Sequence, residues 1–294
     1  MLDKSSIMLY IISEQNEVVM NKLSIEKRTQ IIGLLVEGNS LRATSRLADV
    51  SINTVTKLLV DIGTACQKYH DENVVNVPSK RVQCDEIWSF IYAKDKNLPE
   101  KFQGKYGVGS IWTWTAIDAD SKLMISYLVG NRDAKYAKVF MEDVASRLKN
   151  RVQLTTDGLK AYLEAVDRTF GIDIDYAQLV KLYGNSLEGE HRYSPADCTG
   201  AIKQVVTGDP KAKHISTSYV ERQNLTMRMS LRRFTRLTNA FSKKVENHAH
   251  AIALHFMYYN FVRIHKTLRV TPAMEAGLSK KPWTIEDLAR LLED

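Results

Sequence analysis

The chain has 294 residues, of which 44% are hydrophobic and 26% charged, with a formal net charge of +7 and a pI of about 9.1. This is the composition of a soluble globular protein with room for two domains, and its basic charge favours an anionic partner. Three scattered cysteines exclude a zinc ribbon and argue against a disulfide framework, and no apolar run approaches the roughly 18 residues that a membrane span needs. We therefore expect a cytoplasmic protein without a signal peptide.

Three helices are predicted in the N-terminal third. Ser24, Ser40 and Ser51 are suitable N-cap residues, and each precedes a segment with apolar residues at helical spacing. The second helix is short, and residues 49–50 form a tight turn before the third. Two short helices joined in this way are typical of a helix-turn-helix.

In a helix-turn-helix, the N-terminal residues of the last helix face the bases of the major groove. Asn53, Thr54 and Lys57 would then read bases, and Arg42 and Arg46 would contact phosphate. The alternative is a small three-helix bundle that packs or dimerises. The balanced charge of this region weakens the electrostatic case for DNA, so both interpretations stay open.

The central region has the pattern of an α/β domain. Apolar alternation and turn residues predict strands and helices in the order β-β-β-α-β-α. The strands are expected over 81–93, 110–118, 122–130 and 152–156, and the helices over 134–149 and 159–166. The first and fourth strands of such a mixed sheet can be neighbours, which is the architecture of ribonuclease-H-like nucleotidyltransferases. Residues 167–215 have weak periodicity and are expected to form an elaboration.

Three acidic residues stand in unusual places. Asp85 lies inside an apolar strand, Asp157 follows the fourth strand, and Glu221 opens a basic segment. Buried carboxylates need partners or a metal ion, and three converging ones would suit magnesium or manganese. Each also has an ordinary explanation. Asp85 could be a charge on an edge strand, Asp157 could belong to a turn or cap a helix, and Glu221 could complement a helix dipole. Glu86 remains an alternative to Asp85 as the first metal ligand, since the phase of the strand decides which of the two side chains points toward Asp157. Gly158 would permit a positive φ and close approach of a substrate.

A basic segment follows the third acid. From Arg222 to Lys244 there are seven basic residues and no acidic one, and apolar residues recur at helical spacing. We expect a helix with arginines along it, which would suit phosphate contacts. The alternative is a solvated face with Glu221 as a helix-dipole partner.

Four motifs together resemble the transposases of the insertion-sequence-one family. They are DEIWS at 85–89, TDG at 156–158, ERQNL at 221–225, and YNF with HKTL between 259 and 268. The resemblance covers roughly residues 24–278. One departure is clear, because well-known members carry a cysteine zinc-binding element before the helix-turn-helix and this chain has none.

The resemblance implies an acidic DDE triad on a ribonuclease-H-like core. By motif its members would be Asp85, Asp157 and Glu221, holding two Mg²⁺ or Mn²⁺ ions about 3.5–4 Å apart. The expected phosphate contacts from the basic segment are Arg222, Arg228, Arg232 and Arg233.

The expected function is DNA transposition. The protein would bind the terminal inverted repeats of an insertion sequence, cleave double-stranded DNA at the element ends and join them to target DNA. Pairing two ends requires a homodimer or larger assembly. The expected partner is double-stranded DNA and not a membrane, and the expected location is the bacterial cytoplasm, in association with the nucleoid. The alternatives are a sequence-specific DNA-binding regulator with an inactive core, and a metal-dependent nuclease that cuts without joining.

The expected fold is an α/β, ribonuclease-H-like catalytic domain with a mixed sheet, preceded by an all-α helix-turn-helix domain. The expected divisions are an N-terminal extension at 1–23, the helix-turn-helix at 24–68, a linker at 69–80, the catalytic domain at 81–265 with an insertion at about 167–215, and a helical tail at 266–294.

Overall fold

Three capped helices begin the described part of the chain. The computed structural model describes residues 23–184, 198–235 and 240–293, so nearly all of the expected N-terminal extension lies outside it. The helices are α2 (Ile25–Val36), α3 (Leu41–Leu47) and α4 (Ile52–Asn73). The side chains of Ser24, Ser40 and Ser51 accept hydrogen bonds from backbone N–H groups in the first turns, as the sequence predicts. Helix α4 continues past residue 68 into the expected linker.

The six strands form one mixed sheet in the order β3-β2-β1-β4-β5-β6. Strands β1 and β4 are parallel neighbours, as are β4 and β5, whereas the other pairs are antiparallel. The predicted ribonuclease-H-like arrangement, with the first and fourth strands side by side, is therefore confirmed. The strands are β1 (Arg81–Ile91), β2 (Gly109–Asp118), β3 (Met124–Gly130), β4 (Gln153–Asp157), β5 (Asp175–Tyr183) and β6 (Cys198–Thr207).

Strands β5 and β6 lie in the stretch that we expected to be a weakly periodic elaboration. They extend the sheet beyond β4 and pair antiparallel with each other. Almost every side chain of β6 is exposed, so its sequence carries no alternation of buried and exposed residues. The hydrophobic pattern that identifies a half-buried strand is consequently missing. Residues 185–197, which connect the two strands, lie outside the described residues.

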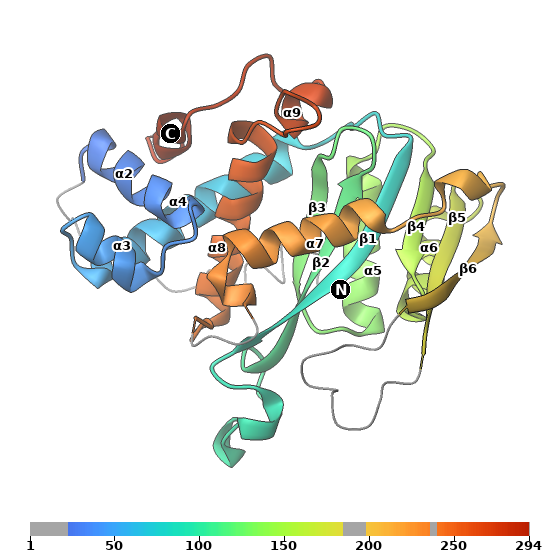
Figure 1. Ribbon diagram of the computed structural model, residues 1–294, viewed down its shortest axis with the longest axis horizontal. Coiled ribbons are helices and arrows are strands. Elements are labelled where there is room, and N and C mark those ends of the chain that lie inside the picture. The colour runs from blue at the N-terminus through green and yellow to red at the C-terminus, as the bar shows by residue number, and fades with distance from the viewer. Residues whose placement is uncertain (1–22, 185–197, 236–239, 294) are drawn as a thin grey trace.

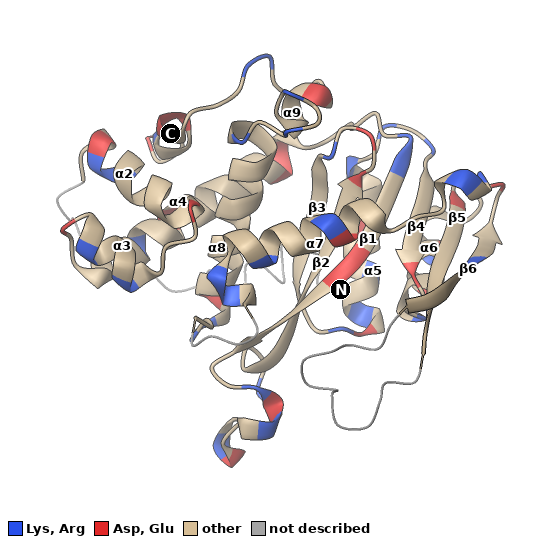
Figure 2. Cartoon of the chain, viewed as in Figure 1, with Lys and Arg blue, Asp and Glu red and all other residues tan. Residues whose placement is uncertain are grey.

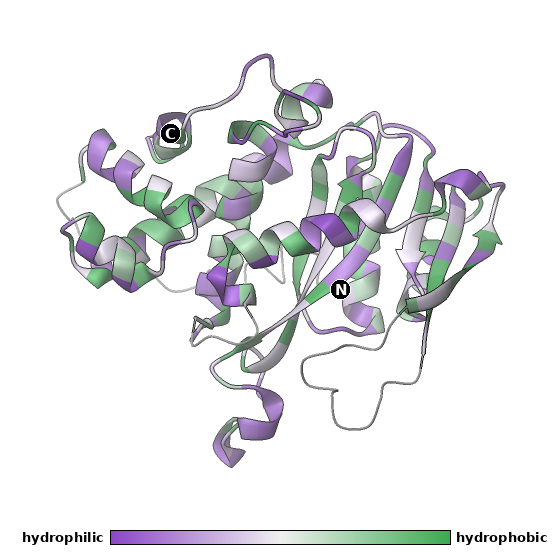
Figure 3. Ribbon diagram, viewed as in Figure 1, coloured by the Kyte–Doolittle hydropathy of each residue, from purple (hydrophilic) through white to green (hydrophobic). Residues whose placement is uncertain are grey.

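Helices cover both faces of the sheet (Figure 1). Helices α5 (Ala134–Arg147) and α6 (Ala161–Phe170) pack on one face, where Trp114 of β2 contacts the rings of Phe140 and Tyr162. Helix α7 (Ser218–Ser230) crosses β1 and β2 on the other face, and α8 (Val245–Met257) lies between the sheet and α4. Apolar residues continue from the helical region, which consists of α2, α3 and α4, through the sheet (Figure 3). The buried ones form one hydrophobic core.

The basic segment is not one helix. The expected helix from Arg222 to Lys244 ends at Ser230, because Leu231 is extended and a 3₁₀ turn follows over Arg232–Phe234. Helix α8 then begins at Val245. The chain ends with α9 (Pro272–Glu275) and α10 (Ile285–Arg290). Among the described helices, none combines the length and apolar character that a membrane span needs.

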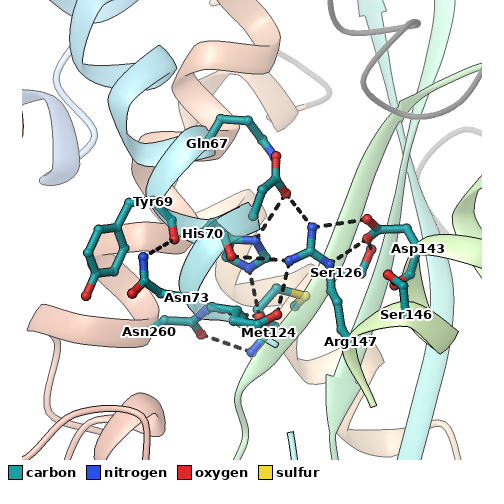
Figure 4. Close-up of polar contacts among 12 residues, drawn as sticks. Gln67, Tyr69, His70, Asn73, Met124, Ser126, Asp143, Ser146, Arg147 and Asn260 are labelled. Carbon is teal, nitrogen blue, oxygen red and sulfur yellow. Dashed lines mark hydrogen bonds and ion pairs between the residues drawn. The ribbon is translucent and has the colours of Figure 1, made fainter. Parts of the chain in front are cut away.

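A buried guanidinium joins the C-terminal end of α4 to α5 (Figure 4). Arg147 of α5 donates to the carbonyl oxygens of His70 and Val74, at 3.2 and 3.1 Å, at the end of α4. It also binds both carboxylate oxygens of Asp143, at 2.8 and 3.0 Å, and the carboxylate of Asp71. One side chain therefore satisfies groups on two helices that are far apart in sequence.

A second contact fixes the same helix end to β3. The imidazole Nε2 of His70 lies 3.2 Å from the carbonyl oxygen of Met124. Asn260 accepts from the Met124 N–H and donates to its carbonyl, each at 2.9 Å. The start of β3 is therefore held by α4 and by the segment that follows α8 (Figure 4).

Replacing Arg147 should destabilise the whole chain. Arg147→Met removes the buried guanidinium that binds Asp143, Asp71 and two carbonyls, so we expect a loss of about 3–5 kcal/mol in the free energy of unfolding, measured by urea titration. Arg168→Met is the matched control, because Arg168 pairs with Glu164 on the surface and is 60% exposed. Its effect should stay below about 1 kcal/mol. Equal losses in the two variants would refute the bridging role of Arg147.

Candidate active site

The register of β1 and β4 brings two acidic residues to one edge of the sheet. Cys84 pairs with Thr156, so Asp85 and Asp157 are the next residues on two parallel neighbours. Strand β4 ends at Asp157, whereas β1 continues for six residues after Asp85. In the described part of the chain, no strand pairs with this edge of β1 between Cys84 and the isolated bridge of Ile91 to Ser242.

Asp157 is held by a local turn. Its Oδ1 accepts the backbone N–H of Leu159 at 3.0 Å. Gly158 does not adopt a positive φ, so that expectation is wrong. A Cβ at Gly158 would lie 3.1 Å from Cγ2 of Val180, so close packing against β5 is what favours glycine there.

Helix α7 brings the third predicted acid. The side-chain oxygen of Gln83 accepts the N–H groups of Tyr219 and Val220, at 2.8 and 3.2 Å, which ties the first turn of α7 to β1. These N–H groups have no partner within the helix, so the contact satisfies them. One turn further, the side-chain amide of Asn224 donates to Oδ2 of Asp85 at 2.8 Å. Glu221 lies on this same stretch of α7.

All three predicted acids line one pocket of about 690 Å³. Three cationic side chains, Arg132, Lys160 and Lys181, line it too. Figure 2 shows the acidic segment of β1 beneath α7, which carries acidic and basic residues of its own. The remaining lining residues are Gly158, Leu159, Leu179, Val180, Tyr183 and Thr217.

Glu221 is held by the protein itself. Its Oε2 accepts from Nζ of Lys181 on β5 at 2.5 Å, and its Oε1 accepts from the hydroxyl of Thr217. One oxygen each from Asp85, Glu86 and Asp157 lie within 4.8 Å of one another, and Glu221 is outside this cluster. The structure therefore brings two of the three predicted ligands together and holds the third at the pocket wall.

Asp85 and Glu86 differ in what they face. Glu86 pairs with Trp114 across the strands and shares its side of the sheet with α5 and α6. Its side chain is fully buried and accepts from Nε of Arg132 at 2.9 Å, and Nη2 of Arg132 lies 3.4 Å from Oδ2 of Asp157. Asp85 points to the α7 side and lines the pocket, whereas Glu86 is absent from the pocket lining.

Burial and mutual repulsion raise the pKa of both neighbouring acids. Burial, and then the charges of Glu86 and Asp157, raise the pKa of Asp85 to about 7. Burial and Asp157 likewise raise the pKa of Glu86 to about 7, against the opposing effects of Tyr162 and Arg132. Clustered carboxylate oxygens with unfavourable charge are the donor set that Mg²⁺ or Mn²⁺ accepts, so the residues fit a divalent ion.

The predicted DNA contacts are distributed over two surfaces. Arg42, Arg46, Asn53 and Lys57 are exposed on α3 and α4, and Lys57 pairs with Asp61 at 2.8 Å. Thr54 is half-buried, and its hydroxyl lies 2.9 Å from that of Ser51.

The predicted contacts after Glu221 are not equivalent. Arg222 and Arg232 are exposed, and Arg228 is half-buried. Arg233 turns inward, where its Nη1 donates to the hydroxyl of Ser242 at 2.7 Å. Because the helix ends at Ser230, the arginines do not share one helical face.

Three polar residues of the site were missed from the sequence. Asn224 could have been found, because it lies three residues after Glu221 on the same helix. Arg132 lies directly before the N-cap of α5, and Lys181 lies in the stretch without periodicity. Neither position has a local sequence feature that would predict a role in the site.

The comparisons with known proteins give distant structural similarities. No protein-family model and no curated protein matches the chain. A piggyBac transposase in a synaptic complex with hairpin DNA is 10% identical, with a TM-score of 0.45, over 97% of this chain and 74% of that one. The Mos1 transposase in a strand transfer complex is 11% identical, with a TM-score of 0.24, over 85% and 83%.

A second Mos1 structure, the paired-end complex with the left transposon end, is 10% identical over 59% of this chain and 65% of that one, with a TM-score of 0.22. These scores are too low to carry a functional argument. None of these similarities identifies the insertion-sequence-one family, and that assignment stays a prediction.

The raised pKa of Asp85 predicts a pH-dependent effect of its removal. Because the folded chain binds this proton more tightly than the unfolded chain, stability from Asp85 falls as pH rises from about 4 to about 7. Without divalent ions, the free energy of unfolding of Asp85→Asn should therefore be about 1–2 kcal/mol higher than that of the wild type near pH 8, and this difference should shrink near pH 5. Urea titrations in a chelator measure both, with the surface variant Glu142→Gln as control. A variant less stable than the wild type near pH 8 would contradict the repulsion.

Proposed function

We propose that the chain is a metal-dependent phosphoryl transferase that acts on DNA. The observation that carries this is one pocket on a ribonuclease-H-like sheet that Asp85, Asp157 and Glu221 line from two strands and a helix. Divalent ions bound there would activate a water or hydroxyl nucleophile and neutralise charge on the attacking and leaving oxygens. Phosphate esters suit the surrounding cations.

The residues of the chain have separate tasks in this proposal. Asp85 and Asp157 hold the metal, and the Asn224 amide fixes the orientation of the Asp85 carboxylate. Glu86 is bound to Arg132 and is absent from the pocket lining, so in this proposal it supports the site from beneath, with one oxygen within 4.8 Å of oxygens of Asp85 and Asp157. Arg132 and Lys160 at the pocket wall contact the backbone of the bound strand.

More specifically, we propose a DDE transposase of the insertion-sequence-one type. The motifs around the three acids support this assignment, together with the capped helices α2, α3 and α4, which suit a helix-turn-helix that binds terminal repeats. Its substrates are the element ends and target DNA, and two ends require at least two copies of the chain. A nuclease that cuts without joining is the competing outcome of the test.

Removing an acid of the pocket should abolish chemistry and spare DNA binding. We expect Asp157→Ala and Asp85→Asn to lower Mg²⁺-dependent cleavage and strand transfer by at least about 100-fold, because the metal loses a ligand. Glu86→Gln should retain activity to within about 10-fold, since Glu86 is absent from the pocket lining.

The assay uses duplexes that carry the inverted repeats flanking the gene, with gel-shift binding measured in parallel. Full strand transfer by Asp157→Ala would refute the triad, and cleavage without joining by the wild type would favour the nuclease. A loss in Glu86→Gln as large as in Asp85→Asn would reverse the assignment of the first ligand.

The helix-turn-helix assignment predicts different effects for a phosphate contact and a base contact. Arg46→Ala should weaken binding to all duplexes and lower the salt slope by about 1, as expected for one lost phosphate contact. Asn53→Ala should instead reduce discrimination between repeat and random duplexes by about 1–3 kcal/mol. Lys68→Ala is the control, because Lys68 is an exposed basic residue near the C-terminal end of α4. Equal losses in Arg46→Ala and Lys68→Ala would argue against this surface.

A further inference from the structure

The third acid of the pocket is bound to a cation of the protein. The Lys181 ammonium lies 2.5 Å from Oε2 of Glu221, and the Thr217 hydroxyl occupies Oε1. Lys181 is on β5 and Glu221 on α7, so the contact spans the pocket that both residues line. Both Glu221 oxygens therefore have donors from the chain, whereas oxygens of Asp85 and Asp157 cluster with one of Glu86.

A metal ion and the Lys181 ammonium compete for the same oxygen. An ammonium 2.5 Å from a carboxylate oxygen weakens the binding of a divalent cation to that oxygen, because the two positive charges repel across one shared ligand. Both side chains are about one-third exposed, so the ion pair is weak enough to break. A lysine has a flexible four-carbon stem, which allows its ammonium to move without a backbone change.

We propose that Lys181 is a positioning residue that withholds Glu221 from the metal until DNA enters the pocket. This rests on the proposed function. A backbone phosphate attracts the ammonium as a carboxylate does, so DNA in the pocket draws Lys181 from Glu221 and takes its charge. The freed Glu221 then completes the metal site. DNA and the divalent ion consequently bind with positive cooperativity, and the complete site forms only on substrate.

The first test is metal binding in the absence of DNA. Calorimetric titration with Mn²⁺ should give affinity at least about 5-fold tighter for Lys181→Met and Lys181→Gln than for the wild type, because Glu221 is released. Lys181→Arg keeps a cation on Glu221 and should bind Mn²⁺ as the wild type does. Lys138→Met is the matched control, since Lys138 pairs with Glu142 on α5, has a similarly exposed side chain (34%) and does not line the pocket. Its affinity should change by less than about 2-fold.

The second test adds a blunt duplex of mixed sequence to the same titrations. The duplex should tighten Mn²⁺ binding by the wild type by a similar factor and leave that of Lys181→Met unchanged, because the ammonium is no longer there to be displaced. A purely structural role of Lys181 would weaken metal binding and not tighten it. Lys181→Met and Lys181→Gln that bind Mn²⁺ no more tightly than the wild type would overturn the proposal. Wild-type protein that binds no Mn²⁺, with or without duplex, would overturn the proposed function itself.

Discussion

The parallel pairing of β1 with β4 is the constraint on which the site depends. With Cys84 opposite Thr156, Asp85 and Asp157 follow at the same level on neighbouring strands. Side chains alternate between the faces of a strand, so a shift of one residue would place Glu86 on the pocket side and turn Asp85 toward α5. Both faces of β1 are buried, so such a shift would move every packed side chain to the opposite face, including Ile87, which shares a face with Asp85.

The electrostatics of the pocket follow from that register. Glu86 and Asp157 share Arg132, and Glu221 has Lys181, so each of these acids has a cation beside it. Asp85 is different, because its described hydrogen-bond partner is the neutral amide of Asn224. Its pKa is raised to about 7, first by burial and then by its acidic neighbours, as is that of Glu86. Because Asp85 lines the pocket and Glu86 does not, we propose Asp85 as the first ligand, where a divalent ion would relieve this unfavourable charge.

The central strands could be predicted because their side chains are either buried at alternating positions or buried throughout. Both arrangements leave a recognisable pattern of apolar residues in the sequence. The sequence predicted the three N-terminal helices because serine caps are local signals. It could not predict β6, whose side chains are nearly all exposed, or the end of α7 at Ser230, where no glycine or proline stands. The candidate ligands were found one by one from their local contexts. Lys181 and Arg132 were not, because their roles depend on which distant strands and loops become neighbours.

Helix α7 links the acidic pocket to the helical region. Its first turn is bound to β1 through Gln83, and its middle contacts Asp85 through Asn224. At its other end, the turn between α2 and α3 approaches so closely that a Cβ at Gly38 would lie 2.7 Å from the carbonyl oxygen of Ser230. Gly38 also has a φ of 79°, so the turn requires glycine twice over. The turn between α2 and α3 therefore packs directly on the backbone of α7 at Ser230. The same helix carries Glu221, so the position of the third acid depends on the helical region as well as on Lys181.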